Sequence, residues 1–179
     1  MNDTSASKRY ADTGALLLEA VLNRPTSDRA IAAIARINYL HDRHRKHGKI
    51  TEPDLLYTLS LFALEPSSWV PRYEWRDLTD MELCAIGTLW KSLGEAFDIP
   101  YTLLPSSPSG WANGLDWLDE LREWSRVYQE KNMVPAVSNK RLADSTFQIL
   151  LWKLPGPLKG VGKNLVAALL EDRLREAMM

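Results

Sequence analysis

The chain has 179 residues, enough for one domain to bury a continuous core. Its 22 Lys and Arg residues nearly balance its 23 Asp and Glu residues. The formal charge of −1 therefore excludes a global field that would attract nucleic acid or an anionic membrane. Cys84 is the only cysteine, which excludes an internal disulfide or a cysteine-rich metal site and predicts a reducing compartment.

Targeting signals are missing from the sequence. Its N-terminus lacks the apolar core of a secretion signal, and no apolar run approaches the roughly 20 residues that span a bilayer. We therefore expect a cytoplasmic protein without a transmembrane segment. Seven tryptophans predict either a wide apolar interior or a flat hydrophobic ligand, and large core fillers explain them equally well.

Helix signals alternate with turns along the chain, and no stretch shows the period-two alternation of a strand. Caps, prolines and glycines predict an all-α fold of about seven helices, near residues 9–22, 28–47, 52–64, 80–97, 114–131, 139–153 and 158–179. We expect a single domain over residues 1–179 that begins with a disordered tail, residues 1–8. If the chain divides, the Pro- and Ser-rich segment 99–110 is the expected joint.

The third and fourth predicted helices begin with clear capping signals. Thr51 is followed by early acids and by Pro53, and Thr79 forms a capping box with Glu82. The third helix is apolar on nearly all sides, so we place it centrally, with core residues Leu55, Leu56, Leu59, Phe62 and Ala63. The prolines of segment 65–76 argue against a regular helix, and its aromatic residues predict an ordered loop packed across the core.

A polar seam crosses the apolar face of the second predicted helix. At about 100° per residue, Asn38 and His41 share one stripe, which predicts a buried histidine. The pattern alone favours a structural histidine bonded to a neighbour over a ligand. His41, His44 and His47 cannot converge on one metal ion, because the first two lie about 60° apart whereas the third is turned about 240° from the first.

Two further sets of polar residues are candidates for a functional site. Arg9 and Thr13 lie one turn apart on the first predicted helix, with Asp12 beside them, and taken alone they indicate a surface pair. Residues 158–163 contain two glycines and two lysines at a helix start. They lack the spacing and the Lys-Ser/Thr ending of a phosphate-binding loop, so we expect no phosphate site there.

Long segments of the chain resemble one known family. The segments on which this resemblance rests are Arg9–Gly14, Ser27–Ala30, Ala35–His41, Asp54–Phe62 and Tyr73–Glu82. They are similar to the fungal ER-bound oxygenases of the mycophenolic acid pathway, which are related to the latex-clearing rubber oxygenases. The resemblance covers nearly the whole chain, from about Ser7 to Met178.

The resemblance implies an all-α enzyme that holds a b-type haem through a histidine and cleaves isoprenoid double bonds with dioxygen. The family's Arg-x-x-x-Thr pair falls on Arg9 and Thr13, which would contact the haem or the groups that hold it, and its axial histidine falls on His41. Rubber oxygenases carry a basic residue where this chain has Asp12, so a proposed base is absent or replaced. Family members are longer and carry a membrane anchor, which we expect this chain to lack.

The expected function is therefore oxidation of a hydrophobic terpenoid or polyketide-derived molecule in fungal secondary metabolism, by haem-dependent cleavage of a carbon–carbon double bond. A haem-free isomerase or cyclase, with Asp12, His41 or His44 as acid or base, is the alternative. A third possible function is that of a binding domain without catalytic activity. We further expect association with the ER surface, and a homodimer that buries apolar surface of the first and last helices.

Overall fold

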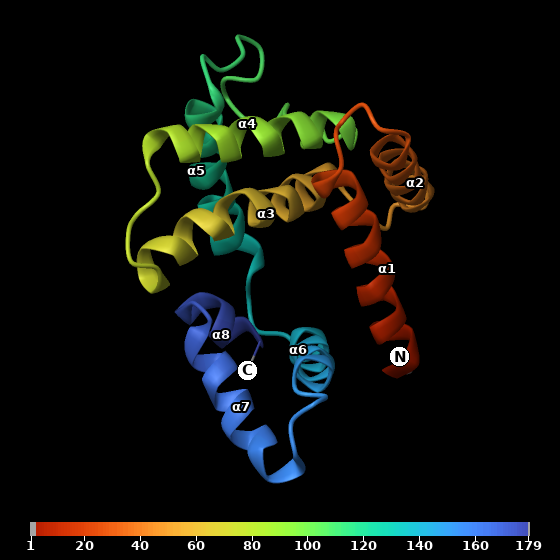
Figure 1. The fold of residues 1–179 in the computed structure, drawn as a ribbon, viewed down its shortest axis with the longest axis vertical. Helices are drawn as coiled ribbons and strands as arrows, with labels where there is room; N and C mark the ends of the chain where they lie inside the picture. Colours follow the sequence, from red (N-terminus) through yellow and green to blue (C-terminus); the bar gives the residue numbers. More distant parts are fainter. Residues whose placement is uncertain (1–2, 179) are drawn as a thin grey trace. The chain divides into compact units, whose positions relative to one another are not determined.

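The computed structural model describes residues 3–178, which form eight helices and no strand (Figure 1). The helices are α1 (Asp3–Leu22), α2 (Asp28–Arg45), α3 (Glu52–Tyr73), α4 (Asp80–Ala96), α5 (Gly114–Asn132), α6 (Val137–Leu150), α7 (Gly156–Leu169) and α8 (Asp172–Met178). The all-α prediction is confirmed. The count exceeds seven because the last predicted helix is two: the backbone at Leu170 is extended, with φ −74° and ψ 146°, which ends α7 before α8 begins. Within the described residues, every helix is either too short or too polar to traverse a lipid bilayer.

The first helix begins earlier than the sequence predicted. We expected a disordered tail over residues 1–8, but α1 is helical from Asp3, and residues 1 and 2 lie outside the described residues. Lys8 donates to Asp12, one turn later, at 2.6 Å. Such an i, i+4 ion pair favours helix, so the polar composition of this segment did not imply disorder.

Contacts along the chain divide it into two compact units. Unit 2 is Ala15–Tyr128, and unit 1 holds the described residues up to Gly14 and from Gln129 onward. The segment 99–110 is therefore not where the contacts divide the chain. It lies inside unit 2, where Ile99, Tyr101 and Leu104 are buried because they fill the core beside α5 and the end of α4.

The core of unit 2 is built around α3, which lies beside α4 (Figure 1). Its largest fully buried side chain is Trp117 of α5. Four of the five core residues predicted on α3 are buried: Leu55, Leu56, Leu59 and Ala63. Phe62 is the exception, at 38% exposed, and its ring stacks on Trp90 of α4 with the centroids 5.3 Å apart. It covers the edge of the core rather than filling it.

The predicted aromatic loop is instead the second half of α3, which continues through Pro66 and Pro71 to Tyr73. Each proline removes one backbone donor. Two serine hydroxyls bond carbonyls in the same turns: Ser67 donates to Leu64 at 2.7 Å, and Ser68 donates to Leu64 and Glu65 at 3.2 and 3.1 Å. The first half of α3 is packed in the core, and this packing favours continuation of the helix despite the two lost donors.

The aromatic side chains of this stretch do not pack across the core as predicted. Trp69 is 39% exposed and contacts Tyr73 one turn later, with the two rings tilted and their centroids 4.9 Å apart. Trp75 follows the end of α3 and is 87% exposed. Because residues 65–73 are helical, Trp69 and Tyr73 lie one above the other along the helix instead of flat on the core.

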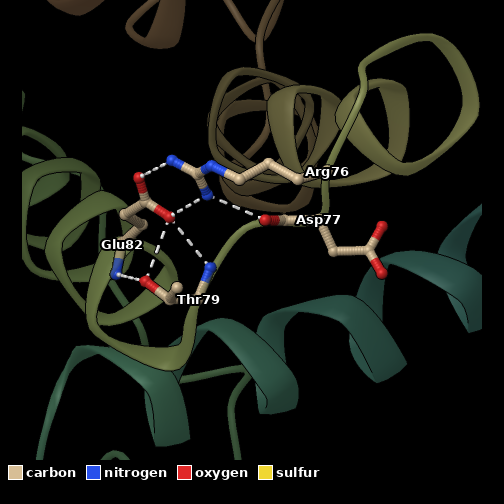
Figure 2. Close-up of polar contacts among 4 residues, drawn as sticks. All are labelled: Arg76, Asp77, Thr79 and Glu82. Carbon is tan, nitrogen blue, oxygen red and sulfur yellow. Dashed lines mark hydrogen bonds and ion pairs between the residues drawn. The ribbon is translucent and has the colours of Figure 1, made fainter.

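The capping box at the start of α4 is confirmed, and Arg76 reinforces it (Figure 2). The amide of Thr79 donates to Glu82 at 2.9 Å, and the amide of Glu82 donates back to the Thr79 hydroxyl at 3.3 Å. Arg76 holds both carboxylate oxygens of Glu82, each at 2.8 Å. This bidentate contact, together with the hydrogen bonds from Thr79, lowers the pKa of Glu82 to about 2.

Glycines allow two close approaches in unit 2. A methyl group at Gly87 of α4 would overlap the backbone of Gly114, the first residue of α5, so these helices meet through bare backbone. At Gly94 a methyl group would overlap the hydroxyl of Tyr101 and a methyl of Leu59. The Tyr101 hydroxyl donates to the Lys91 carbonyl at 2.6 Å and is buried. The two glycines thus hold the 99–110 segment and α5 against α4.

Candidate functional site

The predicted polar seam lies on α2, and it is one residue longer than the sequence suggested. Asn38, His41 and Arg45 are spaced by three and four residues, so they share a face of the helix. All three side chains are partly buried, and each has a buried polar atom without a hydrogen-bond partner: Asn38 Oδ1, His41 Nδ1 and Arg45 Nε. Such unpaired buried atoms are uncommon and call for an explanation.

Two members of the seam bond the C-terminal end of α4. Asn38 Nδ2 donates to the Ala96 carbonyl at 2.9 Å and to the Asp98 carboxylate at 3.0 Å. Arg45 Nη2 donates to the Asp98 carbonyl at 2.6 Å. The last carbonyls of a helix lack partners within it and carry partial negative charge. The amide and guanidinium groups of α2 supply both the missing donors and a compensating positive charge.

The end of α4 has the backbone geometry that presents these carbonyls. The Asp98 amide bonds the Glu95 carbonyl at 3.1 Å, and the Ile99 amide bonds the Gly94 carbonyl at 3.0 Å, which together make a Schellman ending. Asp98 occupies the left-handed position, with φ 53°, that glycine usually fills. Aspartate is among the few other residues that tolerate this conformation.

His41 lies between Asn38 and Arg45 and bonds neither of them through Nδ1. Burial lowers the pKa of His41, and the neighbouring charge of Arg45 lowers it further, while Asp42 opposes the shift. The neutral imidazole is therefore the favoured form at neutral pH. A neutral, half-buried imidazole with an unpaired ring nitrogen can bind a metal, accept a proton or bond a ligand.

Arg9, Asp12 and Thr13 belong to the part of α1 in unit 1, whereas His41 belongs to unit 2. All three α1 side chains are exposed. Arg9 and Thr13 share one face of the helix, as predicted, and Asp12 is engaged by Lys8. Their predicted roles as haem-contacting or acid–base groups stay predictions.

The other two histidines of α2 and the following turn differ from His41. His44 and His47 are both exposed, and His47 Nδ1 lies 2.6 Å from the Arg43 carbonyl. Of the three imidazoles, His41 is thus the one held in a partly buried setting.

Arg45 and Asp98 were missed in the sequence. A signal for Arg45 was present, because it lies four residues after His41 and seven after Asn38, on the same helical stripe. Asp98 carried no comparable signal. It is 53 residues away from Arg45 along the chain, and only the packing of α2 on the end of α4 brings the two together.

Comparison with known proteins identifies the family of this chain. The model of the "ER-bound oxygenase mpaB/B'/Rubber oxygenase, catalytic domain" family matches residues 1–179. The chain belongs to this family. No solved structure matches it.

Three members of the oxygenase family from Penicillium are close in sequence. The ER-bound oxygenase mpaB' of Penicillium brevicompactum is 47% identical over 96% of this chain and 41% of its own length. The ER-bound oxygenase mpaB of Penicillium roqueforti is 46% identical over 96% of this chain and 58% of its own length. The mpaB of Penicillium brevicompactum is 49% identical over 80% of this chain and 37% of its own length. The chain thus spans 37% to 58% of the length of these relatives.

The resemblance of the sequence implies a haem held by a histidine, and the surroundings of His41 fit such a donor. Haem iron takes a neutral imidazole, which is the form that burial favours here. Its Nδ1 is buried and has no protein partner, so no existing bond competes with a ligand at that nitrogen. His44 and His47 lack this setting, because both are exposed.

Proposed function

We propose that the chain is the catalytic-domain part of an oxygenase that acts on a hydrophobic terpenoid or polyketide-derived molecule of fungal secondary metabolism. Membership of the oxygenase family supports the reaction class. The observation that carries the site assignment is the half-buried imidazole of His41, whose Nδ1 is unpaired and whose pKa is lowered. Haem b held by His41 would supply dioxygen activation for cleavage of a carbon–carbon double bond.

The residues around His41 would orient the imidazole. Asn38 and Arg45 fix α2 against the end of α4 through three hydrogen bonds, so the helix turn that carries His41 has a defined position. The positive charge of Arg45 also disfavours protonation of His41, which keeps the ring able to donate a lone pair. For Arg9, Asp12 and Thr13 the roles that the resemblance implies stay proposals of their own, separate from the geometry around His41.

The proposed location is the cytoplasmic side of the ER surface. Support comes from the relatives, which are named ER-bound oxygenases. The proposed assembly is a homodimer, supported by exposed leucines on two helices: Leu18 and Leu22 of α1, and Leu165 of α7. Light scattering at dilute concentration tests the assembly, and a mass of a single 20.3 kDa chain would contradict it.

The deciding experiment is an absorbance spectrum of the protein after incubation with haem and removal of the excess. Retention of a strong near-ultraviolet to blue band with the protein, at one haem per chain, supports the oxygenase proposal. If the protein with haem also consumes dioxygen in the presence of a prenylated aromatic test compound, the result supports the proposed catalytic activity as well. A protein that retains no haem yet converts the compound without dioxygen would contradict the proposal and favour a haem-free isomerase or cyclase. If it retains no haem and converts nothing, the proposal also fails, and a binding domain remains.

A further inference from the structure

Unit 1 contains a pocket that the oxygenase proposal does not use. Its volume is about 1040 Å³, and it is formed chiefly by α6, α7 and the turn between them. Drug-sized ligands occupy pockets of about 300 to 1,000 Å³ that combine apolar walls with a few placed polar groups. The pocket in unit 1 therefore has the size of a small-molecule site.

Aromatic side chains provide the apolar part of this pocket. Phe147 is 7% exposed and belongs to its buried wall, whereas Trp152 is 78% exposed. Indole and phenyl rings gain most from contact with other flat apolar groups. An exposed tryptophan at the same pocket as a buried phenylalanine favours a ligand with a flat apolar body.

Two lysines of α7 line the pocket, and their surroundings differ. Lys163 donates to the Asp144 carboxylate at 3.0 Å and lies 5.1 Å from the centroid of the Phe147 ring. Its charge is thus compensated. Lys159, one turn earlier on the same side of α7, makes no hydrogen bond or ion pair within the described part of the chain. The pocket therefore carries one uncompensated positive charge.

Gly160 leaves open space on the pocket side of α7. It lines the pocket, and a methyl group built on it would meet no atom within 4 Å. Gly162 of the same helix is different, because a methyl group there would press on Leu151 and Leu154. A larger side chain at Gly160 would therefore enter the space of the pocket without displacing protein atoms.

We propose that this pocket binds an amphipathic organic monoanion, with its flat apolar body against Phe147 and Trp152 and its carboxylate or sulfonate group at Lys159. The size, the aromatic wall and the single uncompensated lysine each match this class of ligand. A neutral terpenoid would leave Lys159 without a counter-charge, and a dianion would exceed the charge that the pocket offers.

A matched pair of fluorescent probes tests the proposal on the full chain without haem. Anilinonaphthalene sulfonate has a flat apolar body and one negative charge, and phenylnaphthylamine is the same ring system without the sulfonate. Titration should show one sulfonate probe bound per chain, more tightly than the neutral probe. In Lys159→Gln the sulfonate probe should bind about two- to five-fold more weakly, as expected for an exposed ion pair, and the neutral probe should be unaffected. Lys153→Gln, which changes an exposed lysine that does not line the pocket, should leave both affinities unchanged.

Filling the pocket provides the second test. Gly160→Trp places an indole in open space and replaces a helix-interior glycine, so the variant should melt no lower than the parent. It should weaken binding of both probes by about ten-fold or more. The proposal is overturned if the two probes bind the parent equally, if Lys153→Gln and Lys159→Gln behave alike, or if Gly160→Trp binds both probes like the parent. Each result is independent of whether His41 holds haem.

Discussion

Arg45 of α2 donates from Nη2 to the backbone carbonyl of Asp98, 2.6 Å away, at the point where the chain leaves α4. The contact joins two segments 53 residues apart. It compensates the partial negative charge at a helix end, and Asn38 bonds the same end from one face of α2. The turn of α2 that carries His41 is therefore positioned by its contact with α4.

Replacing Arg45 should weaken the fold measurably. In Arg45→Met the Asp98 carbonyl loses a charged donor, and we expect a decrease in the free energy of unfolding of about 1 to 3 kcal/mol. The measurement is the urea midpoint at neutral pH. Arg43→Met is the matched control, because Arg43 is on the same helix but exposed, and it should change the midpoint little. Equal midpoints for the two variants would mean that the contact with Asp98 contributes no stability.

Replacing His41 should separate a haem ligand from a structural histidine. In His41→Ala the absorbance band of added haem should be lost while the helical circular dichroism signal persists, because the metal bond disappears without a large apolar cavity. His44→Ala and His47→Ala remove exposed imidazoles and should retain the band. A His41→Ala protein that keeps the band would exclude His41 as the ligand. If the parent protein binds no haem and His41→Ala has a lower unfolding midpoint than the parent, His41 is a structural residue.

Lowering the pH should reveal how much the ionised carboxylate of Glu82 contributes to the stability of the fold. Its carboxyl pKa is lowered from 4.5 to about 2, so the folded protein holds this carboxylate ionised where the unfolded chain binds a proton. The stabilisation is thus complete above about pH 4.5 and is lost as pH falls toward about 2. In Glu82→Gln the stability difference from the parent should shrink over this range, measured by urea unfolding between neutral pH and pH 3. Glu52→Gln, which removes an acidic group from the first turn of α3, is the matched control for the loss of a negative charge at a helix start.

Two glycine substitutions should have opposite effects. Gly87→Ala forces a methyl group onto the backbone of Gly114 and should lower the free energy of unfolding by about 1 to 3 kcal/mol. Gly160→Ala meets open space within a helix and should raise it by roughly 0.5 to 1 kcal/mol. Thermal unfolding of both variants beside the parent provides the comparison. A stable Gly87→Ala protein would mean that α4 and α5 can separate at this crossing without cost.

The sequence by itself determined the features that depend on neighbours within a few residues. The capping box at Thr79 joins side chains and amides three residues apart, so the local sequence was sufficient to predict it. The same holds for the all-α class and for the shared face of Asn38 and His41, which follow from helical periodicity. The family resemblance likewise rested on contiguous segments.

Tertiary structure decided the features in which distant segments compete or cooperate. Prolines in residues 65–76 argued locally against a helix, yet α3 continues through them, because its first half is anchored in the core. The composition of residues 99–110 predicted a boundary between domains, but their apolar side chains pack in the core beside α4 and α5. Asp98 could not be linked to Arg45 from the sequence, since the energy of that contact exists only once α2 has packed on the end of α4.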